Sequence, residues 1–270
     1  MTAPAPAPDL PSLLAPLEAL VRRAGAEVMA AYAVPFAVER KADGSPVTAA
    51  DRAAEAILAP GLAALLPGVP VVAEEAMSEP GAPPVAPAGR FWLVDPLDGT
   101  REFVARNGEF TVNVALVDAG LPVLGAVLAP ALDLLYLGVP GLGAWRVAGG
   151  QRSALAARAV PPQGLSVAYS RSHRDDRTER WLSAWPVADR IAVGSALKFG
   201  LLAAGQADVY PRLGPTMEWD TAAGHAVLAA AGGCVLDLQG QPLRYGKPGY
   251  RNPDFVAGAR APGPTLSPAG

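Results

Sequence analysis

The stretch FWLVDPLDGTREF, residues Phe91 to Phe103, decides how this chain is interpreted. A hydrophobic strand is predicted to end at Asp95, and a turn through Pro96 to Gly99 follows at once. We expect the turn to hold Asp95 and Asp98 near each other, with the Leu97 carbonyl between them. Three hard oxygen donors that converge at a strand end are suited to Mg²⁺.

The end of this turn is also suited to a phosphate. Gly99 permits a backbone path that is closed to other residues. Thr100 is predicted to open a short helix, and the free N–H groups of that helix can hold an anion. A helix cap with turn aspartates explains the same residues without any function, so the motif alone leaves both interpretations open.

Other acidic residues also stand at predicted element ends. Glu74 and Glu75 follow an apolar strand, although adjacent acids at such a place usually belong to a solvated loop. Asp220 opens a helix predicted over residues 219–231, where a plain helix cap is the simpler role. Thr48 and Asp51 have the spacing of a capping box, which does not exclude a catalytic role for Asp51.

Five further polar residues are candidates for substrate binding, and each is weak alone. Lys41 and Arg212 are typical of a solvated surface. Ser195 and Lys198 fit a helix start followed by an exposed lysine, and His173 fits a strand end. In a functional interpretation, Ser195 and Lys198 are three residues apart at a helix start and face the same ligand.

The composition excludes several classes of function. The chain has 270 residues, of which 51% are hydrophobic and 17% charged, so a globular protein with a sizeable core is expected. A net charge of −3 argues against general attraction to nucleic acid or to an anionic membrane. With Cys234 as the only cysteine and two histidines, a zinc site is not expected. The cysteine content fits a cytoplasmic protein.

The first half of the chain predicts two helices followed by strands. An amphipathic helix is predicted over residues 12–32 and a second from Thr48 onward. Strands are predicted over residues 69–73, 91–95 and 110–117. The apolar run Leu121 to Trp145 has the length of a membrane span, but prolines and glycines divide it into strand-sized pieces, so no span is expected.

The second half predicts alternating strands and helices. Residues 149–164 lose the apolar pattern, and we place a domain boundary there. Strands are expected over 165–169, 190–193, 207–210 and 234–238, with helices over 175–185, 195–204 and 219–231, which indicates a layered α/β domain. The predicted divisions are a disordered tail (1–11), an N-terminal α+β metal-binding domain (12–156), a C-terminal α/β domain (157–259) and a second disordered tail (260–270).

The order of these motifs resembles the inositol monophosphatase superfamily of lithium-sensitive, Mg²⁺-dependent phosphatases. Within it the chain is most similar to the 3′(2′),5′-bisphosphate nucleotidase branch. The resemblance runs from about Lys41 to Gly258. It is carried by DPLDGTREFVARNGEFTVNVAL (95–116), SRSH (170–173), GSALKFGLLAAGQADVYPRLGPTMEWDTAAGHAV (194–227) and NPDFVAG (252–258).

The resemblance implies a five-layered αβαβα sandwich of two subdomains with the site between them. It implies two or three Mg²⁺ ions, with Mn²⁺ as an alternative. Glu74, Asp95 and the Leu97 carbonyl are expected to hold one ion, and Asp95, Asp98 and Asp220 a second. Since no Ser, Cys or His is placed for covalent catalysis, we expect direct attack by a water that Mg²⁺ activates and that Thr100, hydrogen-bonded to Asp51, orients.

The expected substrate is a small phosphorylated nucleotide, 3′-phosphoadenosine 5′-phosphate or its 5′-phosphosulfate analogue, with the 3′-phosphate cleaved. Inositol monophosphatases resemble the chain in the metal residues but place an acid where Arg212 stands, and a guanidinium binds a second phosphate instead. The residues expected to bind substrate are Lys41, Gly99, Thr100, His173, Ser195, Lys198, Arg212 and Asp220.

Four alternatives stay open. The chain could act on inositol 1-phosphate or another sugar phosphate. A dehalogenase-type phosphatase requires Asp-x-Asp with a covalent aspartate, whereas the spacing here is Asp-x-x-Asp. A non-catalytic phosphate-binding protein would not need the full set of acids. Arg212 could also simply pair with a nearby carboxylate. The number of metals and the oligomeric state, including a homodimer, are left open.

Overall fold

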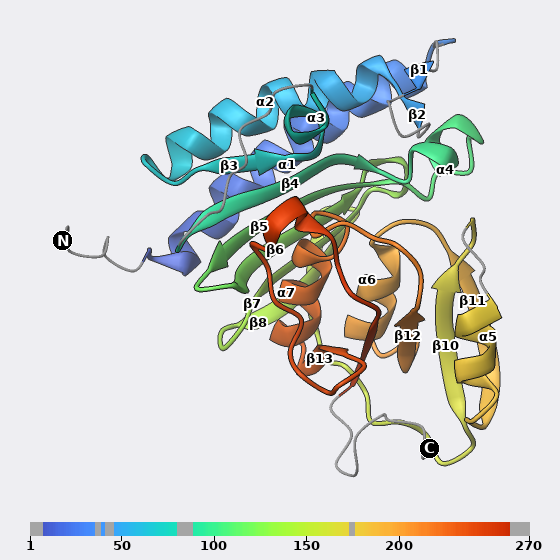
Figure 1. Cartoon of the computed structure of the whole chain (residues 1–270). Helices are drawn as coiled ribbons and strands as arrows, with labels where there is room; N and C mark the ends of the chain where they lie inside the picture. Colours follow the sequence, from blue (N-terminus) through green and yellow to red (C-terminus); the bar gives the residue numbers. More distant parts are fainter. Residues whose placement is uncertain (1–7, 36–38, 41–45, 80–88, 173–175, 260–270) are drawn as a thin grey trace.

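The computed structural model describes residues 8–35, 39–40, 46–79, 89–172 and 176–259 (Figure 1). Lys41 and His173, both proposed to bind substrate, lie outside these residues, as do residues 1–7 and 260–270 of the two predicted tails. The first helix, α1 (Leu10–Tyr32), begins inside the predicted N-terminal tail. Pro11 fits the first turn of a helix, and the buried side chains of Leu13 and Leu14 anchor that turn in the core.

Seven strands form the first sheet. In spatial order they are β3 (Val71–Ala73), β4 (Phe91–Asp98), β5 (Thr111–Asp118), β6 (Leu121–Ala129), β7 (Leu134–Val139), β8 (Gly143–Ala148) and β9 (Gln151–Leu155). β3 and β4 are parallel, and each later pair is antiparallel. The apolar run from Leu121 is therefore a set of strands, as predicted. β9 was missed because it is a largely exposed edge strand, held by pairing with β8 and not by apolar residues.

Alternate side chains of this sheet enter two different cores. Trp92 and Val94 of β4 pack with α1 and α2 (Ala49–Leu65). Phe91 and Leu93 point to the opposite face, toward α6 (Leu197–Ala203) and α7 (Ala222–Ala230). Because side chains alternate across a strand, one short apolar run covers both faces of the sheet.

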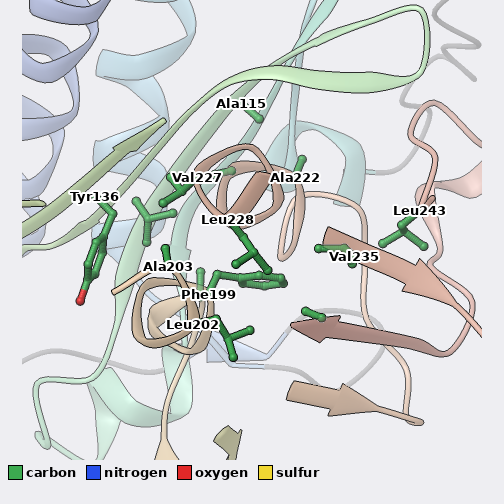
Figure 2. Close-up of a cluster of buried hydrophobic side chains, with 14 of the residues drawn as sticks. Ala115, Tyr136, Phe199, Leu202, Ala203, Ala222, Val227, Leu228, Val235 and Leu243 are labelled. Carbon is green, nitrogen blue, oxygen red and sulfur yellow. The ribbon is translucent and has the colours of Figure 1, made fainter. Parts of the chain in front are cut away.

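The second sheet has five strands. Their order is β11 (Val187–Val193), β10 (Leu165–Ser170), β12 (Val209–Arg212), β14 (Phe255–Ala259) and β13 (Gly233–Asp237). Phe255 and Ala257 of β14 face α6 and α7, whereas Val256 belongs to a separate cluster with Trp181 of α5 (Asp176–Leu182). Figure 2 shows α6 and α7 meeting through their apolar side chains in the layer between the sheets.

The layers are therefore α1 and α2, the seven-stranded sheet, α6 and α7, the five-stranded sheet, and α5 (Figure 1). This is the five-layered αβαβα order that was expected. One core cluster joins both sheets through α6 and α7, so the division into two domains at residue 156 stays a prediction. The remaining short elements are β1 (Glu39–Arg40), β2 (Pro46–Val47), α3 (Glu74–Ser78), α4 (Thr100–Val104), η1 (Pro130–Leu132) and η2 (Pro248–Tyr250).

Two glycines of the first sheet allow the main chain of α7 to pack directly against the sheet. A Cβ atom on Gly125 of β6 would lie 2.4 Å from the Ala223 carbonyl oxygen, and one on Gly138 of β7 would lie 2.5 Å from the Cα of Val227. Any larger residue would push the helix away from the sheet. This contact fixes the turn that precedes α7, which carries Asp220, relative to the sheet that carries Asp95 and Asp98.

No helix among the described residues has both the length and the apolar character to cross a membrane.

Candidate active site

The end of β4 carries two of the predicted carboxylates. Asp95 pairs with Asn113 of β5 and Asp98 pairs with Thr111, so the register shifts between the two aspartates. Strand β4 thus runs through Asp98, three residues beyond the predicted end, because the pairing resumes after the irregularity. The Asp95 side chain is buried, and its Oδ1 accepts a hydrogen bond of 3.0 Å from the Leu97 N–H. That bond holds the Leu97 peptide between the two carboxylates.

Asp98 is half-buried and lies among groups of both charges. Its Oδ2 accepts from the amide of Asn113 at 3.3 Å. Burial raises the pKa of Asp98 to about 6; the positive charge of Lys198 and the Asn113 hydrogen bond oppose this rise, and the charges of Glu102 and Glu74 add to it. A carboxylate with such a pKa stands where a cation is most stabilising.

Asp220 lies in the turn before α7 and does not cap the helix, contrary to the simple helix-cap interpretation. The helix begins at Ala222, and the Asp220 Oδ2 accepts a 2.8 Å hydrogen bond from the Met217 N–H. Burial, followed by the charges of Asp98 and Glu74, raises the pKa of Asp220 well above its ordinary value. The Asp220 carboxylate therefore shares its surroundings with two acids from the first sheet.

Glu74 stands at the first position of α3, directly after β3. It does not lie in a solvated loop, which was the usual place expected for two adjacent acids. Its side chain lines the same cavity as the aspartates. The neighbouring Glu75 donates its backbone N–H to the carboxylate of Glu55 on α2, at 3.0 Å. Of the two adjacent acids, Glu74 is thus the one at the cavity.

One cavity of about 240 Å³ collects most of the predicted site residues. The predicted residues that line it are Glu74, Asp95, Leu97, Asp98, Gly99, Thr100, Ser195, Lys198, Arg212 and Asp220. Sequence reasoning did not assign a role to the other lining residues, which are Arg101, Glu102, Ser170, Phe199, Tyr210, Thr216 and Thr221. Arg101, Phe199 and Thr221 are adjacent in sequence to predicted residues, and that proximity was the available signal.

Asp51 is buried, is not among the residues that line the cavity, and forms the predicted capping box. Its Oδ2 accepts hydrogen bonds of 2.8 Å from both the N–H and the hydroxyl of Thr48. The predicted hydrogen bond between Thr100 and Asp51 is not formed, because the Thr100 hydroxyl donates to the Leu97 carbonyl oxygen at 3.3 Å. A threonine in the first turn of a helix readily bonds to a carbonyl three residues back, and this local bond competes with a distant partner.

The acidic residues have the donor chemistry of a Mg²⁺ site. Carboxylate and carbonyl oxygens from Glu74, Asp95, Leu97 and Asp220 line a single cavity, and these hard oxygens suit Mg²⁺ better than zinc. Within the described ranges, no group of three acidic, histidine or cysteine side chains is already arranged to hold a metal ion. A cation placed among these carboxylates would neutralise the repulsion between them.

The same cavity is also lined by two basic residues, Lys198 and Arg212. Lys198 is only 4% exposed and Arg212 only 8% exposed. Neither is therefore a solvated surface residue, which was the alternative to a role in substrate binding. Burial is the main cause that lowers the pKa of Lys198 to about 8, while Asp98 opposes it. The Arg212 Nη2 donates to the Pro215 carbonyl at 3.0 Å, and its Nε, which is buried, has no hydrogen-bond partner.

Arg212 makes no ion pair with any carboxylate in the described part of the chain. The alternative that it merely pairs with a nearby acid is therefore not supported. Tyr210, two residues earlier on β12, packs its ring 5.1 Å from the Lys198 ammonium. Both cations line the cavity and the charge of Arg212 lowers the pKa of Lys198, so an anionic ligand would stabilise both.

Comparison with known proteins places this arrangement in a family. The model of the inositol monophosphatase family matches residues 9–262. The 3′(2′),5′-bisphosphate nucleotidase CysQ of Escherichia coli K12 is 49% identical over 240 residues, which cover 87% of this chain and 95% of that protein.

Two solved structures share the fold. CysQ from Bacteroides thetaiotaomicron has a TM-score of 0.77 and 35% identity, over 93% of this chain and 98% of that one. An inositol monophosphatase from Anabaena (Nostoc) sp. PCC 7120 has a TM-score of 0.73 and 26% identity, over 93% and 92% of the two chains. The chain described here belongs to the inositol monophosphatase family.

Proposed function

We propose that this chain is a metal-dependent 3′(2′),5′-bisphosphate nucleotidase that cleaves the 3′-phosphate of 3′-phosphoadenosine 5′-phosphate, leaving AMP and phosphate. The observation that carries this proposal is the buried, unpaired Arg212 guanidinium in the wall of a carboxylate-lined cavity. The relatives named CysQ support it, since the first of them match nearly the full length of this chain.

Two groups of side chains in the cavity are suited to two different phosphates. The carboxylates of Glu74, Asp95, Asp98 and Asp220 would hold Mg²⁺, which would neutralise charge on the phosphate to be cleaved. The cations Lys198 and Arg212 bind the phosphate that stays on the product. Bidentate donation by a guanidinium suits a phosphate, whereas it cannot accept the hydroxyl hydrogens of an inositol.

Mg²⁺, when bound, lowers the pKa of water and neutralises charge on the phosphate. The residues of the chain supply the remaining steps. Thr100 orients the attacking water, and Asp51 accepts its proton through the threonine hydroxyl, which requires Thr100 to turn from the Leu97 carbonyl toward Asp51. Gly99 and the following N–H groups face the phosphate. Ligand sets, metal count, homodimer and cytoplasmic location stay predictions.

The test compares Arg212→Ala with the wild type on 3′-phosphoadenosine 5′-phosphate and on 3′-AMP, which lacks the second phosphate. Loss of a desolvated charged contact should cost about 2–4 kcal/mol in kcat/KM on the bisphosphate only. Arg152→Ala, which removes a 42% exposed arginine on β9, is the control and should change neither substrate. An equal loss on both substrates, or a wild type that prefers inositol 1-phosphate, would refute the proposal.

A further inference from the structure

Glu109, in the loop before β5, connects the first sheet to two strands of the second. Its carboxylate accepts hydrogen bonds of 2.7 Å from both Nε and Nη2 of Arg171, which follows β10. It also accepts one of 2.8 Å from the N–H of Gly194, which follows β11. Arg171 donates in addition to the Ala192 carbonyl. Desolvation raises the pKa of Glu109, but these bonds and the Arg171 charge outweigh it and keep the carboxyl ionised.

Main-chain groups of the two segments also meet at this connection, through Ser195 and Gly194. The hydroxyl of Ser195 lies 2.8 Å from the Asp98 carbonyl oxygen and 2.7 Å from that of Glu109. Ser195 has a φ of 53°, a left-handed conformation that a serine adopts rarely and that its surroundings hold in place. A Cβ on Gly194 would lie 2.6 Å from the Glu109 carbonyl oxygen, so the two segments touch through their backbones.

This contact determines where Lys198 lies. Its ammonium donates to the carbonyl oxygens of Ser195 and, at 3.4 Å, of Val193. Both carbonyls flank Gly194, whose N–H is bound by Glu109. The ammonium that lines the cavity is therefore held by a loop whose position depends on a carboxylate outside the cavity.

We infer that Glu109 is a positioning residue. Together with Arg171 it clamps the 193–195 loop to the end of β4, which carries Asp95 and Asp98. The clamp thereby fixes Lys198 for the second phosphate of the substrate. The inference rests on the proposed function for the identity of that phosphate. Ser195 then acts as part of this clamp and does not bind the ligand directly. Its single hydroxyl proton is already shared between the carbonyls of Asp98 and Glu109.

The experiment changes each partner of the Glu109–Arg171 ion pair separately. Glu109→Ala and Arg171→Ala remove it, while Glu109→Gln and Arg171→Lys keep one acceptor or the charge. The matched control is Glu179→Ala, which breaks an exposed ion pair of 2.9 Å with Arg190 on β11. We expect the alanine variants to raise KM for 3′-phosphoadenosine 5′-phosphate about 10-fold, with kcat and the kinetics on 3′-AMP changed less than about twofold. The conservative variants should be intermediate and the control unchanged.

Hydrogen exchange of residues 190–198 supplies a readout that does not depend on the substrate, and exchange should be faster in Glu109→Ala than in the control. A loss of kcat on both substrates, or unchanged KM with unchanged exchange, overturns the inference. If the wild type does not prefer the bisphosphate, the proposed substrate is wrong, and exchange alone then decides the clamp: faster exchange supports it and equal exchange refutes it.

Discussion

Asp98, at the end of β4, and Asp220, in the turn before α7, come from different halves of the chain and line one cavity, where the charge of Asp98 is the largest contribution after burial that raises the pKa of Asp220. Two carboxylates in this relationship destabilise each other unless a cation lies between them. The close packing of α7 on Gly125 and Gly138 keeps them together. A divalent cation bound between these two carboxylates would remove their repulsion.

Replacing Asp95 or Asp220 by Asn should abolish phosphatase activity while the protein still folds. Each change removes a charged ligand from the proposed Mg²⁺ site and relieves repulsion between acids, so the Tm without Mg²⁺ should stay equal or rise. Activity and Mg²⁺-dependent change in Tm are the measurements, since a ligand that binds the folded state raises Tm. Asp118→Asn is the control, because Asp118 lies at the end of β5 in a partly buried ion pair with Arg90 and does not line the cavity. Mg²⁺-dependent turnover in either active-site variant would contradict the assignment.

The stereochemistry at phosphorus should invert during hydrolysis. We expect water to attack in line, because no serine, cysteine or histidine among the described residues that line the cavity is placed as a covalent nucleophile: Ser195 is bound to two carbonyls, and Ser170 lies at the end of β10. A substrate with a chiral, isotopically labelled phosphate gives the measurement. Retention of configuration, or a trapped phosphoenzyme, would favour the dehalogenase-type mechanism instead.

Lithium should inhibit at millimolar concentration when Mg²⁺ is limiting. Li⁺ is a small, hard cation that fits the oxygen ligands Asp95, Asp98 and Asp220 but has half the charge of Mg²⁺, so it occupies the site without supporting the reaction. Initial rates at several Mg²⁺ concentrations test this, with K⁺ at equal ionic strength as the control. Rates that do not respond to Li⁺ would separate this chain from the lithium-sensitive members that it resembles.

Acid should destabilise the protein through His225. This histidine is buried on α7, burial lowers its pKa from 6.5 to about 4, and its Nδ1 lies 3.0 Å from the Tyr245 hydroxyl. Between those pH values the unfolded chain binds more protons than the folded one, so the stabilisation present above pH 6.5 is lost as the pH falls toward 4. The loss amounts to about 3 kcal/mol.

His225→Gln should reduce this pH dependence, because an amide keeps a donor for Tyr245 but does not titrate. Urea unfolding at pH 7.5 and pH 4.5 gives the free energy of unfolding of both proteins. The wild type should lose more free energy of unfolding than the variant when the pH falls from 7.5 to 4.5. Because both proteins have the same carboxylates, the comparison cancels the effect of carboxylate titration. An equal difference at both pH values would show that His225 does not titrate as its burial implies.

The local chemistry of the site could be predicted from the sequence. The capping box of Thr48 and Asp51, the bond from the Leu97 N–H to the Asp95 side chain, and the positive φ of Gly99 each depend on neighbours within a few residues. The expected turn at residues 96–98 is instead an irregular continuation of β4. The apolar run at residues 91–94 likewise predicted strand β4. Such features are encoded in short segments because backbone geometry and local hydrogen bonds decide them.

The tertiary structure alone decided which polar residues are buried and what they contact. Lys198 and Arg212 belong to residue types that are mostly exposed, yet both are buried. They are buried because α6 and β12 pack against elements from distant parts of the chain. The contact of Glu109 with Arg171 and Gly194 joins the two sheets, and no spacing in the sequence predicts it. Thr100 shows the reverse, because its hydroxyl bonds to the nearby Leu97 carbonyl where a distant partner, Asp51, was expected. Short-range geometry follows from residue order, whereas burial and charge pairing depend on which segments the packing of the core brings together.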